Sequence, residues 1–94
     1  MPRYEKQGRD KEYFCEVVLD DVRVYVAQGE RKTGTSEWTI TDTDRRTYGF
    51  RFEPERAPAF YAEQIAELAH KKYTNVGDAT PEVAAMQAKR EQAG

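Results

Sequence analysis

Apolar side chains recur at every second position from about residue 12 onwards. A period of two is typical of a strand that buries one of its faces. Asp20-Asp21 interrupts the alternation, and we interpret it as a two-residue turn that places Leu19 opposite Val22. In that register the apolar members of the hairpin share one face: Tyr13, Cys15, Val17, Leu19, Val22, Val24 and Val26.

Two further strands are predicted in the middle of the chain. The third strand carries Trp38 and Ile40, the fourth carries Tyr48, Phe50 and Phe52, and all five are predicted to lie in the core. Pairing Trp38 with Phe50 and Ile40 with Tyr48 leaves a three-residue loop, a common hairpin length. The glycines and the basic pair within residues 29–36 indicate a longer loop before the third strand.

A helix is predicted over residues 59–73, because Pro54 and Pro58 end the fourth strand and suit a helix start. Its apolar stripe, at helical spacing, consists of Tyr61, Ile65 and Leu68. A second, short helix is predicted from Thr80-Pro81, where a hydroxyl cap precedes a proline. This helix has few large apolar groups, so it either packs on a partner or frays.

These elements predict an α+β fold in one domain. We expect a four-stranded antiparallel meander sheet with one amphipathic helix packed on one face. Residues 1–10 are polar and have no period, which indicates a flexible N-terminal arm. Residues 11–76 form the ββββα domain, and residues 77–94 form a short C-terminal helix or a tail.

Composition and charge narrow the class of protein. The chain has 94 residues, of which 12% are aromatic, and this is too rich in aromatics for a disordered chain. The net charge of -2 provides no overall positive field that attracts DNA or anionic lipid. A single cysteine, Cys15, and the lack of a bilayer-length apolar run or a signal-peptide pattern predict a cytoplasmic protein.

The sequence has no constellation of catalytic or metal-binding residues. His70 is the only histidine, which argues against His-rich metal sites and against a catalytic triad. Cys15 points into the predicted core, where a thiol is inert unless its pKa is lowered. We therefore predict a protein that is not an enzyme and that has no catalytic residues, metal site or cofactor.

The face of the sheet that the predicted helix leaves bare carries the candidate site. By the same alternation, this face exposes the aromatic rings of Phe14 and Tyr25 beside Arg23 and Arg51. Aromatic and guanidinium groups on an open sheet can stack on unpaired bases. Phosphate contacts are predicted for four residues of the neighbouring loops, Arg31, Lys32, Arg45 and Arg46.

The same face allows other uses. Phe14 and Tyr25 also suit cross-strand pairing within the sheet or burial in a homodimer interface. Three carboxylates on this face would repel a nucleic-acid backbone, namely Glu12, Glu16 and Glu37.

The order of elements from about Lys11 to Tyr73 resembles the Pur-alpha family and the single-stranded-DNA-binding domain of positive cofactor four. The local similarity is strongest where the last strand enters its helix, in Tyr48-Gly49-Phe50-Arg51-Phe52-Glu53-Pro54-Glu55 and Phe60-Tyr61-Ala62-Glu63-Gln64-Ile65. This resemblance implies a dimer that binds single strands on curved sheets, with suitable positions occupied by Phe14, Arg23, Tyr25 and Arg51.

Two hypotheses of function follow. In the first, a homodimeric, non-enzymatic binding module engages single-stranded nucleic acid through the open sheet face and the basic loops. In the second, the protein is a protein-binding regulator or inhibitor, like some small proteins of mobile elements and phages. It would then dock by the same face or by the edge of a strand.

Overall fold

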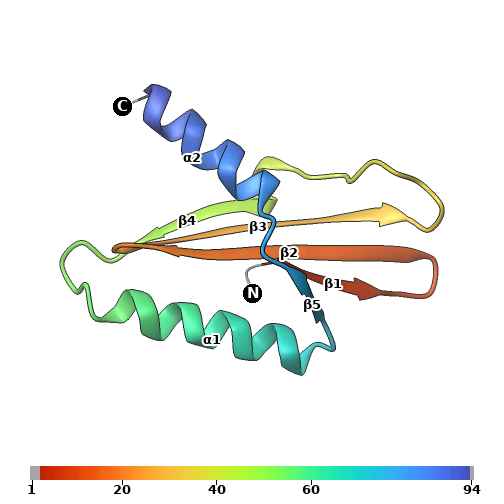
Figure 1. The fold of residues 1–94 in the computed structure, drawn as a ribbon, viewed down its shortest axis with the longest axis horizontal. Helices are drawn as coiled ribbons and strands as arrows, with labels where there is room; N and C mark the ends of the chain where they lie inside the picture. The colour runs from red at the N-terminus through yellow and green to blue at the C-terminus, as the bar shows by residue number, and fades with distance from the viewer. Residues whose placement is uncertain (1–2, 94) are drawn as a thin grey trace.

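The computed structural model describes residues 3–93 and shows an open five-stranded antiparallel sheet with two helices (Figure 1). The strand order is β4-β3-β2-β1-β5. The elements are β1 (Arg3–Gln7), β2 (Lys11–Asp20), β3 (Arg23–Lys32), a 3-10 turn (Asp42–Asp44), β4 (Arg45–Gly49), α1 (Arg56–His70), β5 (Thr74–Gly77) and α2 (Pro81–Ala93). The predicted α+β class and an antiparallel meander sheet are confirmed, but the strands differ: the strand predicted at residues 37–41 is absent, and β1 and β5 were not predicted.

The central hairpin of β2 and β3 keeps the predicted faces but not the predicted partners. Leu19 lies opposite Val24 rather than Val22, so the register differs by two residues. Asp21 has a φ of 56°, and the turn therefore lies one residue later than Asp20-Asp21. Because the shift is an even number of residues, every side chain stays on the face that its alternation predicted.

The predicted third strand is wrong. Within residues 37–41 only Thr39 bridges to the sheet, through a pair of backbone hydrogen bonds with Glu30, and β4 pairs directly with β3. Gly29 belongs to β3 rather than to a loop. A Cβ atom at Gly29 would lie 2.6 Å from the Phe14 ring and 2.9 Å from the Thr39 carbonyl oxygen. Glycine at this position therefore permits the close approach of the 37–41 segment.

Two short strands form where the sequence indicates none. Residues 3–7 of the predicted flexible arm are β1, which pairs with β2, whereas Met1 and Pro2 lie outside the described residues. After α1 the chain turns at Lys72, whose φ is 71°, and forms β5 against β1. Both strands are polar and short, so neither shows the alternation that identifies β2 and β3.

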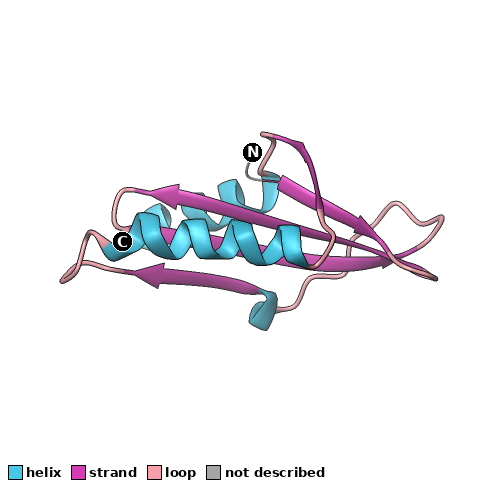
Figure 2. Ribbon diagram, turned by 90° about the horizontal axis from the view of Figure 1, so that it is seen from below, coloured by secondary structure: helices cyan, strands magenta, loops and turns pink. Residues whose placement is uncertain are grey.

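One face of the sheet packs against α1 (Figures 1 and 2). The predicted stripe of α1 is confirmed, because Leu68 is buried and Tyr61 and Ile65 pack against the same cluster. The buried residues of this cluster are Tyr4, Cys15, Val17, Val24, Val26 and Leu68. Phe52, predicted in the core, is instead 90% exposed, because β4 ends at Gly49 and the chain then turns away.

The other face of the sheet is covered by α2, which contradicts the expectation that it lies bare. Figure 2 shows the long helix in front of the sheet and the second helix behind it. Val83 of α2 is fully buried with Tyr25 and Ala27, and Met86 and Val18 pack against them. Of the predicted C-terminal segment 77–94, residues 81–93 therefore form a helix packed on the sheet, and Gly94 lies outside the described residues.

Candidate functional site

The two aromatic residues expected on an open face are both buried. Phe14 is 0% exposed and Tyr25 is 3% exposed. The ring of Trp38 meets Phe14 edge-on at 4.9 Å, and the Arg3 guanidinium lies 4.5 Å from the Phe14 ring centre. Tyr25 lies in the cluster of Val83 beneath α2. Neither ring is accessible to a base in this arrangement. The expectation that Phe14 and Tyr25 form an exposed stacking surface is therefore wrong.

The predicted phosphate-binding residues lie away from Arg23 and Arg51. Arg31 and Lys32 are at the end of β3, at the opposite end of the β2–β3 hairpin from Arg23. The Arg31 guanidinium stacks 4.2 Å from the Trp38 ring centre and pairs with Glu12 at 3.0 Å. The structure therefore divides the eight predicted residues among separate places.

Arg45 and Arg46 begin β4 and point to opposite faces of the sheet. The Arg45 guanidinium lies 3.8 Å from the Glu82 carboxylate on α2. The Nε of Arg46 donates a hydrogen bond of 3.2 Å to the Thr43 carbonyl oxygen.

Arg23 and Arg51 do come together, in a cleft of about 480 Å³ at one end of the molecule. We call this cleft the arginine cleft; it is lined by Arg23, Gly49, Phe50, Arg51, Phe52, Glu53, Arg56 and Arg90. Four separate elements supply the arginines: the start of β3, the turn after β4, the start of α1 and the C-terminal half of α2. Sequence reasoning missed Arg56 and Arg90, because they lie on helices whose docking positions the alternation of the strands does not show.

The arginine cleft combines positive charge with an exposed ring. Among its lining residues, Glu53 is the one carboxylate, and it accepts a hydrogen bond of 2.8 Å from Arg56. The Phe52 ring is 90% exposed, and the Arg51 guanidinium lies 5.8 Å from the ring centre. Guanidinium groups recognise phosphates by charge and by paired hydrogen bonds. An exposed aromatic ring offers a surface for stacking, so the cleft combines groups that suit an anion with a ring that suits a flat apolar group.

Arg90 reaches the cleft because Glu16 holds the start of α2 against the sheet. The Glu16 side chain is fully buried, and its Oε1 accepts hydrogen bonds from the backbone N–H groups of Glu82 (3.1 Å) and Val83 (3.0 Å). Its Oε2 pairs with the Arg3 guanidinium. The first N–H groups of a helix have no intrahelical partner and carry the positive end of the helix dipole. Glu16 therefore supplies the cap that α2 needs from 66 residues away.

Burial raises the pKa of Glu16, while the Val83 hydrogen bond and the Arg3 charge oppose that shift. Sequence alternation correctly placed Glu16 on this face but as an exposed carboxylate that repels nucleic acid. In the structure its charge is instead enclosed and matched by donors, so it does not face the arginine cleft. A glutamate within an otherwise apolar run of β2, Cys15 to Val18, was the available signal.

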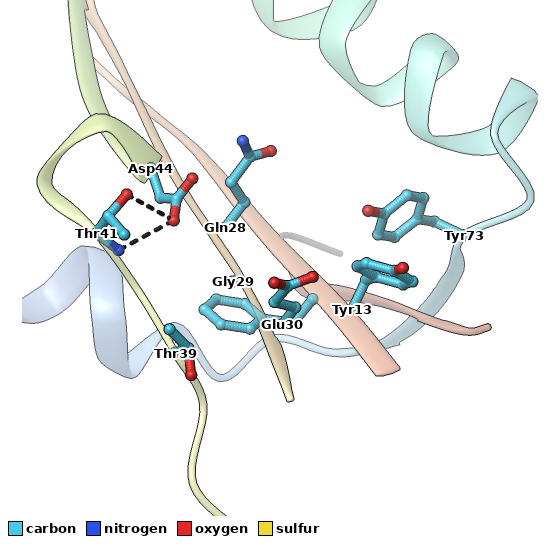
Figure 3. A pocket seen from close by; sticks show the side chains of 9 residues that line it. Tyr13, Gln28, Gly29, Glu30, Thr39, Thr41, Asp44 and Tyr73 are labelled. Carbon is cyan, nitrogen blue, oxygen red and sulfur yellow. Dashed lines mark hydrogen bonds between the residues drawn. The ribbon is translucent and has the colours of Figure 1, made fainter. Parts of the chain in front are cut away.

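A second pocket, of about 380 Å³, lies at the other end of the hairpin (Figure 3). Asp44 and Thr41 lie on one side of it, Tyr13 and Tyr73 lie next to each other on the other side, and Gln28 and Glu30 of β3 lie between them. Both carboxylates have partners: Glu30 pairs with Lys11 at 3.3 Å, and Asp44 accepts from the Thr41 N–H and hydroxyl, each at 3.0 Å. The Thr41 hydrogen bonds lower the pKa of Asp44, and burial raises the pKa of Tyr73. The two charged side chains of the lining, Glu30 and Asp44, are therefore already engaged by the protein's own chain.

Cys15 lies in the α1 cluster and is 4% exposed. Burial raises the pKa of its thiol to about 12, so the thiolate form that acts as a nucleophile is scarce at neutral pH. Among residues 3–93, no group of three or more His, Cys, Asp and Glu side chains is placed to hold a metal ion. Within the same described residues, no helix is long and apolar enough to cross a membrane.

Comparison of the chain with protein families, with curated proteins and with solved structures finds no match. The similarity to the Pur-alpha family and positive cofactor four is thus confined to an antiparallel sheet combined with helices.

Proposed function

We propose that the protein is a non-enzymatic binding module that engages single-stranded nucleic acid through the arginine cleft. The observation that supports this most is the convergence of four arginines and one exposed phenylalanine ring on a single cleft. Arg51 and Phe52 are adjacent in sequence, so one short turn presents a phosphate ligand and a stacking surface together.

The exposed ring favours a single strand over a duplex. A base offers its flat face to a side chain only when it is not stacked inside a helix. Phe52 lies at the rim of the molecule, where an unpaired base can reach it without distortion of the sheet. The overall charge of -2 means that attraction to phosphate has to come from this local group of arginines. Binding should consequently be short-ranged and sensitive to salt.

Fluorescence anisotropy with a labelled oligonucleotide tests the proposal. Four neutralised phosphates on a single strand give a slope of log affinity against log salt of about −3. Arg51→Ala and Arg90→Ala should each weaken binding and reduce the magnitude of the slope by about 0.7. Arg56→Ala should have the smallest effect of the four, because Arg56 already has Glu53 as a partner. Lys89→Ala, one residue from Arg90 on the same helix and outside the cleft lining, is the matched control and should leave the slope unchanged.

Phe52→Ala separates stacking from charge. Loss of one stacked base should reduce affinity about 5- to 150-fold while the salt slope stays the same. Phe52 is almost fully exposed, so this substitution should leave folding intact. Affinity that is undetectable, or that does not respond to salt, would contradict the proposal.

The predicted phosphate contacts outside the cleft can be tested with the same measurement. Alanine variants of Arg31, Lys32, Arg45 and Arg46 report whether a longer oligonucleotide extends along the hairpin or towards β4.

A protein-binding role makes a different prediction for capture from a cell extract. If a protein partner survives nuclease treatment and is lost with Phe52→Ala, the cleft serves protein recognition instead.

A further inference from the structure

The outer edge of β4 is an open margin of the sheet. β4 stands at one end of the strand order, and its inner edge pairs with β3. The Phe50 N–H donates 2.8 Å to the Val22 carbonyl oxygen, so residue 50 is hydrogen-bonded towards β3. Backbone groups alternate in direction along an antiparallel strand. The backbone N–H and C=O groups of Tyr48 and Arg46 are therefore also directed towards β3, whereas those of Thr47 are directed outward.

We infer that this edge pairs with the same edge of a second copy of the chain, antiparallel and about a two-fold axis at Thr47. A five-residue strand with Thr47 at its centre uses its whole length in this register. Thr47 then lies opposite Thr47 of the second copy, and both residues direct their backbone hydrogen-bonding groups across the axis. The sheet would continue through the interface, which removes one exposed edge from each copy.

The charges on β4 favour this register over the one with its axis at Arg46. With the axis at Thr47, Arg46 lies opposite Tyr48 of the second copy, and Arg45 lies opposite Gly49 of the second copy. A guanidinium beside a tyrosine ring is a favourable pair, and the glycine leaves room for a long side chain. An axis at Arg46 would instead place Arg46 against itself, and like charges directly opposite each other are unfavourable. The register with the most strand pairing therefore also has no arginine opposite an arginine.

Pairing at Thr47 would add a residue to each arginine cleft, and this part of the inference rests on the proposed function. Gly49 lines the cleft, and a Cβ atom built on it would have no other atom within 4 Å. Arg45 and Gly49 project to the same face as Arg23. Arg45 of the second copy would therefore lie across Gly49 from Arg23, at the wall of the cleft.

A strand edge of this length buries less area than the roughly 1,000 Å² of a stable interface, so the free dimer should be weak. A bound polyanion should strengthen it, because phosphates offset the repulsion among the added arginines. The dimer fraction should consequently rise with protein concentration and rise further when oligonucleotide is added.

Sedimentation velocity tests the inference, with concentrations from about 1 µM to about 500 µM, the range in which weak complexes dissociate. The wild type should shift from monomer to dimer. Thr47→Pro removes the outward N–H without removing a hydrogen bond to β3, and it should remain monomeric. Thr47→Val keeps the N–H and should dimerise like the wild type. Circular dichroism shows whether the proline variant is folded.

Cross-linking provides a second measurement that does not depend on the proline variant. Thr47→Cys should form a disulfide between copies, because paired strands bring such residues to about 5.5 Å between Cα atoms. Cys15 is buried and does not compete. Ser36→Cys, on an exposed loop, is the control and should cross-link much less. A wild type that stays monomeric with and without oligonucleotide, and a Thr47→Cys variant no more cross-linked than the control, would overturn the inference.

These outcomes distinguish the dimer from the proposed function. Salt-dependent binding that is weakened in Phe52→Ala, together with a monomer at every concentration, leaves the proposed function and removes the dimer. A dimer without oligonucleotide binding gives the opposite result. If both hold, Arg45→Ala should weaken oligonucleotide binding in the wild type and have little effect in the monomeric Thr47→Pro chain.

Discussion

The two faces of the sheet are covered by helices in different ways. On the α1 face, six buried residues make one cluster in which Cys15 and the aliphatic side chains of β2 and β3 meet Leu68. On the α2 face, the buried cluster is smaller, and beside it a fully buried carboxylate, Glu16, joins the sheet to the helix. The first face depends on apolar area, and the second also depends on a few directed hydrogen bonds.

This difference decides how each helix is specified. An apolar stripe attracts any matching surface, so α1 needs little beyond its spacing of Tyr61, Ile65 and Leu68. α2 has few large apolar side chains on the face that it packs against the sheet. Its position is fixed by the hydrogen bonds that two of its backbone N–H groups donate to the Glu16 carboxylate. Because α2 carries Arg90, the polar contact on the second face also places one wall of the arginine cleft.

Removal of the Glu16 carboxylate should give the largest loss of stability. Glu16→Ala takes the acceptor from the Glu82 and Val83 N–H groups and leaves the Arg3 guanidinium, only 13% exposed, without this carboxylate. Breaking a buried charge pair from one side typically destabilises by about 3–5 kcal/mol. Urea unfolding followed by circular dichroism measures the change.

Glu5→Ala is the matched control for Glu16→Ala. Glu5 also pairs with Arg3, at 3.1 Å, but its side chain is 35% exposed. Its removal should cost less than about 1 kcal/mol. Equal losses for Glu5→Ala and Glu16→Ala would show that the buried carboxylate does not hold the second face together.

The pH dependence follows from the direction of the Glu16 pKa shift. Because burial raises the pKa of Glu16 above its usual 4.5, the folded state binds the Glu16 proton more tightly than the unfolded chain does. The stabilisation that this proton gives to the folded state is fully present below pH 4.5 and is lost as the pH rises through the folded-state pKa. Glu16→Gln cannot ionise. The stability of the wild type relative to Glu16→Gln should therefore fall as the pH is raised from 4.5 upward. A difference that is constant with pH would contradict the shift.

Leu68→Ala and Val83→Ala compare the two faces directly. Leu68 belongs to the larger cluster, so its truncation should destabilise the chain by about 2–4 kcal/mol. Val83 is fully buried, but it is smaller and belongs to the smaller cluster, so Val83→Ala should cost about 1–2 kcal/mol. Amide hydrogen exchange should separate the two effects further. Leu68→Ala should speed exchange throughout the sheet, whereas Val83→Ala should speed it mainly in α2.

The parts of the fold that depend on apolar periodicity were predictable from the sequence. The faces of β2 and β3 and the stripe of α1 are correct, because burial forces alternate or helically spaced side chains to one side. The two-residue error in the hairpin register left those faces unchanged, since side-chain direction has a period of two. Periodicity thus determines which side a residue faces more firmly than which residue it meets.

The errors arose where position depends on distant partners. Trp38 alternates like a strand residue, yet it packs edge-on against Phe14, and Gly29 makes space for its segment. β1 is mostly polar, and backbone pairing with β2 and β5, rather than burial, holds most of it in place. It therefore lacks the apolar alternation that would identify it as a strand. Of the candidate site, Arg23 and Arg51 line the same cleft, whereas the exposed ring beside them is Phe52 rather than Phe14 or Tyr25. No local pattern shows that α2 covers those two residues' face and brings Arg90 to the cleft.

The smallest expected change tests whether α2 needs its polar contact with Asp20 at the end of β2. Gln87, one turn before Arg90, donates an exposed hydrogen bond of 3.1 Å from its Nε2 to the Asp20 carboxylate. Gln87→Ala should alter stability by less than about 0.5 kcal/mol, since surface contacts contribute little. Oligonucleotide affinity should fall by about twofold, because the helix end that carries Arg90 is less firmly held. Gln87→Glu places a second carboxylate against Asp20 and should lower affinity more than alanine does. If both variants bind like the wild type, the contacts at the start of α2 suffice to position the whole helix.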